Sequence, residues 1–304
     1  MSGDGASNGY LIQAGFCRQW QLCLQTGRTV PKNRYFIYYL QALNFIMKSL
    51  MKKSIVLLVV IVFTLIGCSN IFAGPPKFKA LVLAERGDQH EKFVVAALDW
   101  LNVFAAENNF EFTVINHASE IDEAFLSKYQ VIIQLNYAPY NWGEKAMAAF
   151  VNYIEDGQGG WVGFHHATLL GEFDGFPMWN WFSDFMGGIR FKNYIAATAS
   201  GTVNVEDRNH PVMKGVPASF VIPDDEWYTY NKDPRPSIHV LASVDESTYN
   251  PDSDIKMGDH PVIWTNEKVK ARNVYFQFGH GPVLLNSSEF KTMVGNAIMW
   301  AAEK

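Results

Sequence analysis

The sequence predicts an α/β fold in which a mostly parallel sheet is flanked by helices. From Lys77 onward, short apolar runs alternate with amphipathic segments, as they do when crossover helices connect parallel strands. The run Val131–Leu135 is rich in β-branched residues, which is typical of a buried strand. No internal repeat or second-domain linker interrupts the pattern, so we expect one domain over residues 77–304.

The first half of this domain is predicted to contain four strands and two long helices. Phe78–Ala84 reads as the first strand, and Glu91–Glu107 as the first helix because its apolar residues recur at helical spacing. Gly143–Asp156 is the second helix, which Gly157 is expected to end. The other strands are expected at Glu111–Asn116, Val131–Leu135 and Gly160–Phe164.

The second half is predicted to contain shorter elements. The aromatic segment Phe176–Phe185 reads as a helix that covers one end of the sheet, and Ser287–Ala302 as the closing helix. The longest polar interruptions, Pro223–Glu226 and Thr248–Met257, are expected to be loops. The strands are expected at Thr202–Val205, Ile238–Val244, Val262–Thr265 and Val274–Phe278.

Residues 51–73 are predicted to be a signal peptide. Two lysines precede an apolar run from Ile55 to Ile66, which is short for a bilayer span but suits the apolar region of an export signal. We therefore expect an exported protein of the periplasm or envelope, and we expect residues 1–50 to be an upstream extension with Met47 or Met51 as the true start. The alternative is that residues 55–66 form a membrane anchor or a buried helix.

The end of the apolar run has two candidate processing sites. Leu65-Ile66-Gly67-Cys68 resembles a bacterial lipobox, and we prefer lipidation of Cys68 to cleavage after Ala73, which would release a soluble protein. The other cysteines are Cys17 and Cys23, so the domain has no disulfide and no cysteine nucleophile. Beyond Cys68 the chain has 18 basic and 29 acidic residues, a formal charge of −11. This negative charge argues against nucleic acid as a partner. We expect contact with a membrane only through the leader or a lipid anchor.

Histidines at three strand ends form the predicted site. In a doubly wound sheet, ligands bind where loops leave the carboxyl ends of the strands. These loops carry His90 after the first strand, His165 and His166 after the fourth, and His280 after the last. We interpret the other histidines as structural. His117 and His239 are expected to be ordinary polar residues, and His210 and His260 are expected to belong to local turns.

Glu226 is the carboxylate expected beside these histidines, because the neighbouring Trp and Tyr would shield it from water. His165, Glu226 and His280 are predicted as catalytic acid–base residues or as ligands of a divalent metal such as zinc. Aromatic residues near the strand ends would stack on the apolar faces of a sugar. The residues expected to bind substrate are His90, His166, Asp225, Trp227, Tyr228 and Trp264.

Four motifs, in order, resemble those of the ThuA-like (trehalose utilisation) family. Gly159–Ala167 is similar to the family's Gly-Gly-x-x-Gly-x-His segment. His210-Pro211-Val212 and Asp225-Glu226-Trp227-Tyr228 resemble its His-Pro-Ile and Asp-Glu-Leu-Tyr motifs, and Pro261–His280 resembles its closing block. The resemblance spans residues 77–303. The first loop, Glu85-Arg86-Gly87-Asp88, departs from the glycine-rich turn of many relatives, which weakens the case for a phosphate-binding role there.

The resemblance implies a flavodoxin-like fold of the class I glutamine amidotransferase type. True amidotransferases carry a cysteine nucleophile at the turn where this chain has His165-His166, so glutamine hydrolysis through a thioester is excluded. The family is linked to the utilisation of sugars, particularly oxidised (keto) disaccharides, which implies a small carbohydrate as partner.

From the residues and the resemblance together, we expect a hydrolase or lyase that acts on a sugar or keto-sugar glycoside by His/Glu acid–base chemistry, with or without a metal. The first alternative is a non-catalytic sugar-binding or accessory protein with a degenerate amidotransferase pocket. The second is a subunit that docks onto an oxidoreductase.

Overall fold

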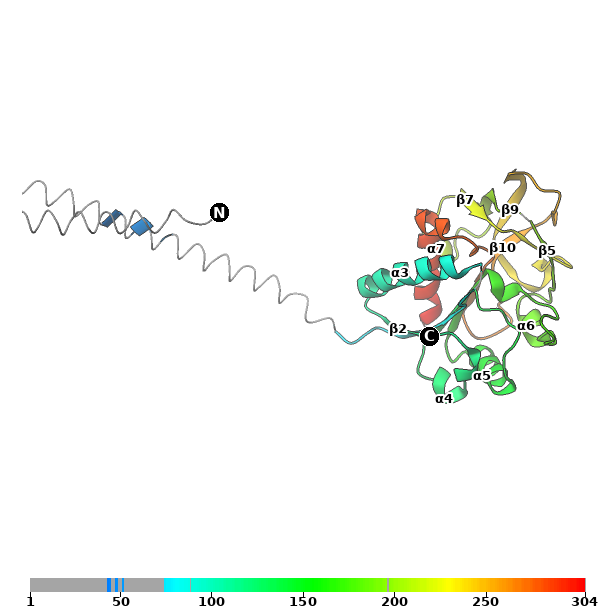
Figure 1. The fold of residues 1–304 in the computed structure, drawn as a ribbon, viewed down its shortest axis with the longest axis horizontal. Helices are drawn as coiled ribbons and strands as arrows, with labels where there is room; N and C mark the ends of the chain where they lie inside the picture. The colour runs from blue at the N-terminus through cyan, green and yellow to red at the C-terminus, as the bar shows by residue number, and fades with distance from the viewer. Residues whose placement is uncertain are drawn as a thin grey trace, which may run out of the picture. The chain divides into compact units, whose positions relative to one another are not determined.

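The computed structural model describes residues 43–44, 47–48, 51, 74–87, 89–195 and 197–303. The chain divides into two units, Met1–Ala73 and Gly74–Lys304, and the second contains the α/β domain (Figure 1). The processing sites at Cys68 and Ala73, with nearly all of the predicted leader, lie outside the described residues. None of the helices that the described residues build has both the length and the apolar character needed to cross a bilayer.

Five parallel strands form one part of a nine-stranded sheet, and their carboxyl ends therefore meet at one edge. This central part, with helices on both faces, confirms the predicted mostly parallel α/β sheet. Among the expected strands, the third and fourth have the predicted bounds. The spatial order is β2 (Glu111–Ile115), β1 (Lys79–Ala84), β3 (Val131–Leu135), β4 (Gly160–Phe164) and β11 (Asn273–Phe276).

Antiparallel strands extend the sheet beyond β11 in the order β10 (Pro261–Thr265), β9 (His239–Asn250), β6 (Ala199–Val205) and β7 (Ser219–Asp225). A separate antiparallel pair joins β5 (Phe191–Tyr194) to β8 (Tyr228–Tyr230). The predicted loop Pro223–Glu226 is wrong, because its first three residues belong to β7. A proline is tolerated there because β7 is an edge strand. The predicted loop Thr248–Met257 also begins inside a strand, since β9 runs to Asn250.

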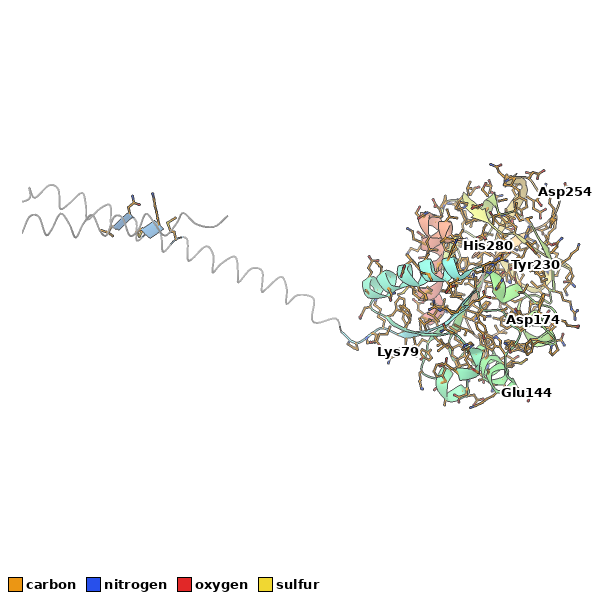
Figure 2. All side chains as sticks on the ribbon, viewed as in Figure 1. Lys79, Glu144, Asp174, Tyr230, Asp254 and His280 are labelled. Atoms are coloured by element: carbon orange, nitrogen blue, oxygen red, sulfur yellow. The ribbon has the colours of Figure 1, made fainter. Side chains whose placement is uncertain are left out.

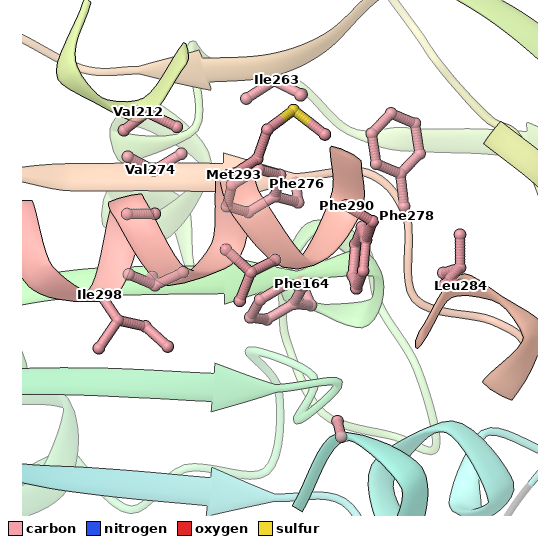
Figure 3. Close-up of a cluster of buried hydrophobic side chains, with 14 of the residues drawn as sticks. Phe164, Val212, Ile263, Val274, Phe276, Phe278, Leu284, Phe290, Met293 and Ile298 are labelled. Carbon is pink, nitrogen blue, oxygen red and sulfur yellow. The ribbon is translucent and has the colours of Figure 1, made fainter. Parts of the chain in front are cut away.

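Helices cover both faces of the sheet (Figure 1). On one face, α3 (Glu91–Asn108) and α7 (Ser288–Ala302) bury their apolar sides, and Figure 3 shows Phe290, Met293 and Ile298 of α7 beside Phe164, Val274 and Phe276 of the strands. On the other face lie α4 (Glu123–Leu126), α5 (Glu144–Glu155) and α6 (Asn180–Phe185). Short 3₁₀ helices are η1 (Ala118–Glu120), η2 (His165–Thr168), η3 (Pro211–Met213), η4 (Arg235–Ser237) and η5 (Pro282–Asn286).

The helix ends follow local signals in the sequence. The Ser287 hydroxyl accepts a hydrogen bond from the Phe290 amide at 3.1 Å and so caps the start of α7. Gly157, with φ of 66°, ends α5 as predicted. The predicted helix Phe176–Phe185 forms only as the shorter α6, because a proline at position 177 disfavours helical backbone at Phe176.

We predict that Gly160→Ala destabilises the domain, because a Cβ at this position would overlap the backbone carbonyl group of Ala301 in α7. The expected loss is about 1–3 kcal/mol of unfolding free energy, measured by urea denaturation. Gly74→Ala is the matched control, since a Cβ there meets no atom within 4 Å, and its effect should stay below about 0.5 kcal/mol. Equal stability of the two variants would contradict the tight packing of α7 on β4.

Candidate active site

Loops at the carboxyl edge of the parallel strands bring six titratable side chains together. Three of these loops follow β1, β4 and β11, and the fourth connects β7 to β8 from the antiparallel half of the sheet. Figure 2 labels the member that follows β11, His280. The six residues are Glu85, His90, His165, His166, Glu226 and His280.

Four of these residues, His90, His165, Glu226 and His280, form what we call the inner cluster. One ligand-type atom of each lies within 4.8 Å of those of the other three. His90 Nε2 is 3.0 Å from His280 Nδ1, and Glu226 Oε2 is 3.3 Å from His165 Nε2 and 3.6 Å from His280 Nδ1. These separations resemble those between the ligands of a tetrahedral zinc ion, which are about 3.3 Å apart for metal–nitrogen bonds of about 2.0 Å. The structure thus brings the three predicted catalytic residues together and adds His90.

The backbone turn at His165 fixes the floor of the inner cluster. His165 is fully buried and has φ of 38°, in the left-handed region that residues other than glycine rarely adopt. Its carbonyl oxygen accepts hydrogen bonds from the Tyr275 hydroxyl at 3.0 Å and the Thr168 hydroxyl at 3.2 Å. Its Nδ1 lies 2.9 Å from the Gln277 carbonyl oxygen. These contacts hold a strained backbone conformation in place, as is common at functional sites.

The hydrogen bond to Gln277 determines which nitrogen of His165 carries the proton. A carbonyl oxygen only accepts, so Nδ1 is the donor. Burial lowers the pKa of His165 to about 4, which leaves the ring neutral at pH 7 and Nε2 with a lone pair. Nε2 faces Glu226 Oε2, and a carboxylate oxygen also has only lone pairs to offer. Two acceptors that face each other at this distance are stabilised by a cation between them.

Glu85 and His166 lie beside the inner cluster and share His90 with it. Glu85 Oε2 is 2.7 Å from His166 Nδ1 and 3.9 Å from His90 Nδ1. We call Glu85, His90 and His166 the outer cluster, because their ligand-type atoms also lie within 4.8 Å of one another. The rings of His90 and His166 meet edge to face with centroids 4.0 Å apart.

Asp225 lies beneath the inner cluster and joins two of its loops. This carboxylate is fully buried and accepts hydrogen bonds from the backbone amides of Glu226 at 2.7 Å, Gly279 at 3.1 Å and His280 at 3.2 Å. Burial raises the pKa of Asp225 to about 7, although the three amides oppose this effect. Its contacts make Asp225, which the sequence predicted to bind substrate, a residue that positions Glu226 and His280.

The electrostatics of the inner cluster differ from residue to residue. Burial first, and then the neighbouring charges of His166, His165 and His280, lower the pKa of His90 to about 2. The Glu226 carboxylate, 3.6 Å away, raises the pKa of His280 above its usual value. Burial on its own raises the pKa of Glu226, but in the acidic range where Glu226 titrates, His165 and His280 are protonated, and their contacts with the carboxylate outweigh burial and lower its pKa to about 2. Glu226 is therefore ionised at neutral pH, while His90 stays neutral.

The aromatic residues predicted to bind substrate occupy different places. Tyr228 packs against the His165 ring with centroids 4.1 Å apart and so supports the site. Trp227 is 1% exposed, and its indole nitrogen donates to the Ala199 carbonyl oxygen at 2.8 Å. Trp264 is also 1% exposed and packs on Tyr275 inside the sheet. Both tryptophans belong to the hydrophobic cores, so neither presents a ring face to the site.

The remaining histidines have structural partners or lie on the surface. His210 Nδ1 accepts the Val212 amide at 3.3 Å, which agrees with the expected turn role, and His117 is exposed. His260 lies 2.9 Å from Glu246 and 3.1 Å from the Gln277 side chain, behind the site. The sequence reasoning missed Glu85 and Gln277 as site residues. Glu85 directly follows the first predicted strand, so the signal that selected the histidines could have found it, whereas Gln277 lies inside the predicted strand Val274–Phe278 and follows β11 only in the structure.

Comparisons with known proteins agree with this fold. The model of the ThuA family, described as trehalose utilisation, matches residues 79–301. The structure of a ThuA-like protein from Bacteroides uniformis ATCC 8492 is 31% identical with a TM-score of 0.67, and the match covers 76% of this chain and 93% of that one. A ThuA-like protein from Parabacteroides merdae ATCC 43184, 18% identical, has the same fold with a TM-score of 0.54 over 75% of this chain and 90% of that one.

No curated protein matches the sequence. The family match covers all the described strands and the six clustered side chains, and the B. uniformis protein is similar over nearly its whole length. These findings confirm the resemblance seen in the four sequence motifs, and they support a role related to carbohydrate. The chain therefore belongs to the ThuA family, the family of trehalose utilisation.

Proposed function

We propose that this protein is a metal-dependent enzyme that acts on a sugar or a keto-sugar glycoside, with the inner cluster as its active site. The observation that carries the proposal is the contact between His165 Nε2 and Glu226 Oε2, two acceptor atoms 3.3 Å apart. The proton of His165 is on the opposite nitrogen, and the pKa of about 4 keeps a second proton off the ring at pH 7. A divalent metal ion between them satisfies both atoms.

The donor set of the inner cluster indicates the kind of ion. Three imidazoles and one carboxylate suit zinc or another first-row divalent ion, whereas calcium and magnesium prefer oxygen ligands. The Gln277 carbonyl oxygen orients the His165 ring, as outer partners do for metal-binding histidines. Such an ion would polarise a sugar carbonyl or hydroxyl oxygen and lower the pKa of a bound water.

Substrate is expected to approach past His280 and Glu226. Their side chains are 20% and 12% exposed, whereas that of His165 is fully buried. We assign acid–base exchange with the substrate to these two residues, in line with the roles predicted from the sequence. A carbon next to a ketone is acidic enough to lose a proton to such a base. Elimination, hydration or isomerisation of a keto-sugar then needs no covalent nucleophile, and the turn after β4 carries histidines instead of a cysteine.

The arrangement of the rings favours an enzyme over a non-catalytic sugar-binding protein. A degenerate pocket predicts histidines that point apart. The ring centroids of His90, His165 and His280 instead lie 4.7–5.9 Å from one another. Buried imidazoles this close together oppose one another's protonation. Their ring nitrogens therefore keep lone pairs, which a common ligand can use.

We predict that the purified protein contains a bound divalent ion and that His165→Ala and Glu226→Gln each bind fewer ions per chain. Each change removes one of the two facing acceptors, so the ion loses a ligand. Elemental analysis by mass spectrometry after dialysis gives the ion count. His239→Ala is the matched control, because His239 also contacts a carboxylate, Glu267, at 2.7 Å but lies outside the cluster. An ion count that is zero in the wild type, or the same in all variants, would overturn the metal assignment.

We also predict that the protein converts a trehalose derivative in which one ring hydroxyl is oxidised to a ketone. Glu226→Gln should lower kcat by about 10²–10⁴-fold, because it removes a carboxylate from the acid–base pair while keeping its shape. Chromatographic detection of product measures turnover, and circular dichroism checks that the variant is folded. Saturable binding of the keto-sugar without turnover in the wild type would favour the sugar-binding alternative. Full activity in folded Glu226→Gln would show that Glu226 has no catalytic role.

A further inference from the structure

Three buried ligand-type atoms of the outer cluster face one another without hydrogen-bond partners. They are Glu85 Oε2, His90 Nδ1 and His166 Nδ1, and within the described residues none of them makes a hydrogen bond. His90 is 4% exposed and His166 is 7% exposed, so water does not readily compensate for the missing bonds. Glu85 Oε2 and His166 Nδ1 are only 2.7 Å apart, but their orientation is not that of a hydrogen bond.

Other histidine–carboxylate pairs in the domain behave differently. His239 Nδ1 makes a hydrogen bond of 2.7 Å with Glu267, and His260 Nδ1 makes one of 2.9 Å with Glu246. In those pairs the ring nitrogen and the carboxylate share a proton along the line that joins them. The outer cluster has the same residue types, and its three ligand-type atoms lie within 4.8 Å of one another, yet none of them makes a hydrogen bond. This geometry is typical of ligands around a cation.

We propose that Glu85, His90 and His166 bind a second divalent metal ion, next to the ion of the inner cluster. Two imidazoles and one carboxylate are the ligand set of many catalytic zinc sites, which leave a further position for water or substrate. Zinc, or an ion of similar preference such as cobalt, is therefore the expected occupant. The three ligands come from the loops after β1 and β4, two parallel strands that lie on either side of β3, so the sheet brings these loops to the same edge.

His90 connects the two sites. Its Nε2 lies in the inner cluster, 3.0 Å from His280 Nδ1, whereas its Nδ1 faces Glu85 and His166 in the outer cluster. With an ion on each nitrogen, the neutral ring would release its single N–H proton to solvent and would bridge the ions as an imidazolate. Only this bridge rests on the proposed function, because Glu85 and His166 are not part of the inner cluster.

The test is an ion count on purified protein after incubation with zinc and dialysis. We expect two ions per chain in the wild type and one in Glu85→Gln and in His166→Asn, substitutions that keep nearly the same shape. Glu226→Gln should also retain one ion, that of the outer cluster. His239→Asn, the matched surface control, should retain two. Circular dichroism confirms that each variant is folded. Replacing the zinc with cobalt gives visible absorption bands. With similar contributions from the two sites, the intensity of these bands should fall by about half in each single-site variant.

The outcomes separate this inference from the proposed function. One ion in the wild type that is lost in Glu226→Gln but kept in Glu85→Gln and His166→Asn would overturn the outer site and leave the inner site intact. One ion lost in Glu85→Gln and His166→Asn but kept in Glu226→Gln would support the outer site and overturn the metal role of the inner cluster. No ion in any protein would overturn both.

Discussion

The hydrogen bond from His165 Nδ1 to the Gln277 carbonyl oxygen is the contact on which the site depends. It joins the turns that follow β4 and β11, two neighbouring parallel strands, so it forms only when the centre of the sheet is assembled. It places the proton on the side of the ring away from Glu226 and leaves Nε2 as an acceptor. In the other tautomer Nε2–H would donate a hydrogen bond to the Glu226 carboxylate, but the Nδ1 lone pair would then face the Gln277 carbonyl oxygen, which only accepts.

The carboxylate of the inner cluster comes from the antiparallel half of the sheet. The three histidines of that cluster come from loops after parallel strands, whereas Glu226 comes from the connection between β7 and β8. Asp225 joins the two halves by accepting backbone amides from both loops. Its burial is unfavourable, as the raised pKa of about 7 indicates, so the three amide contacts offset part of a real desolvation penalty. In return for this penalty, the contacts of Asp225 hold Glu226 in position.

Features that depend on local signals or on the order of elements could be predicted from the sequence. The bounds of β3 and β4 follow from their apolar runs, and the grouping of the histidines follows from the rule that parallel strands end at one edge. Tertiary contacts decided the rest. Trp264 is aromatic and near a loop in sequence, but it pairs with Tyr275 within the sheet and is buried. Glu85 directly follows β1, but several polar residues come after it in the same loop, and its contact with His166 in the folded domain is what separates it from them.

The position of His90 at the start of α3 explains why carboxylates flank it. The N-terminus of a helix carries partial positive charge, which disfavours a cation close to it and opposes protonation of the ring. Burial acts in the same direction, and the pKa of His90 falls to about 2. A ring that resists protonation keeps its lone pair for a metal, because metal ions and protons compete for the same nitrogen. Glu85 on one side and Glu226 on the other would then supply the negative charge that a bound cation needs, and this arrangement would allow one imidazole to serve the two proposed sites.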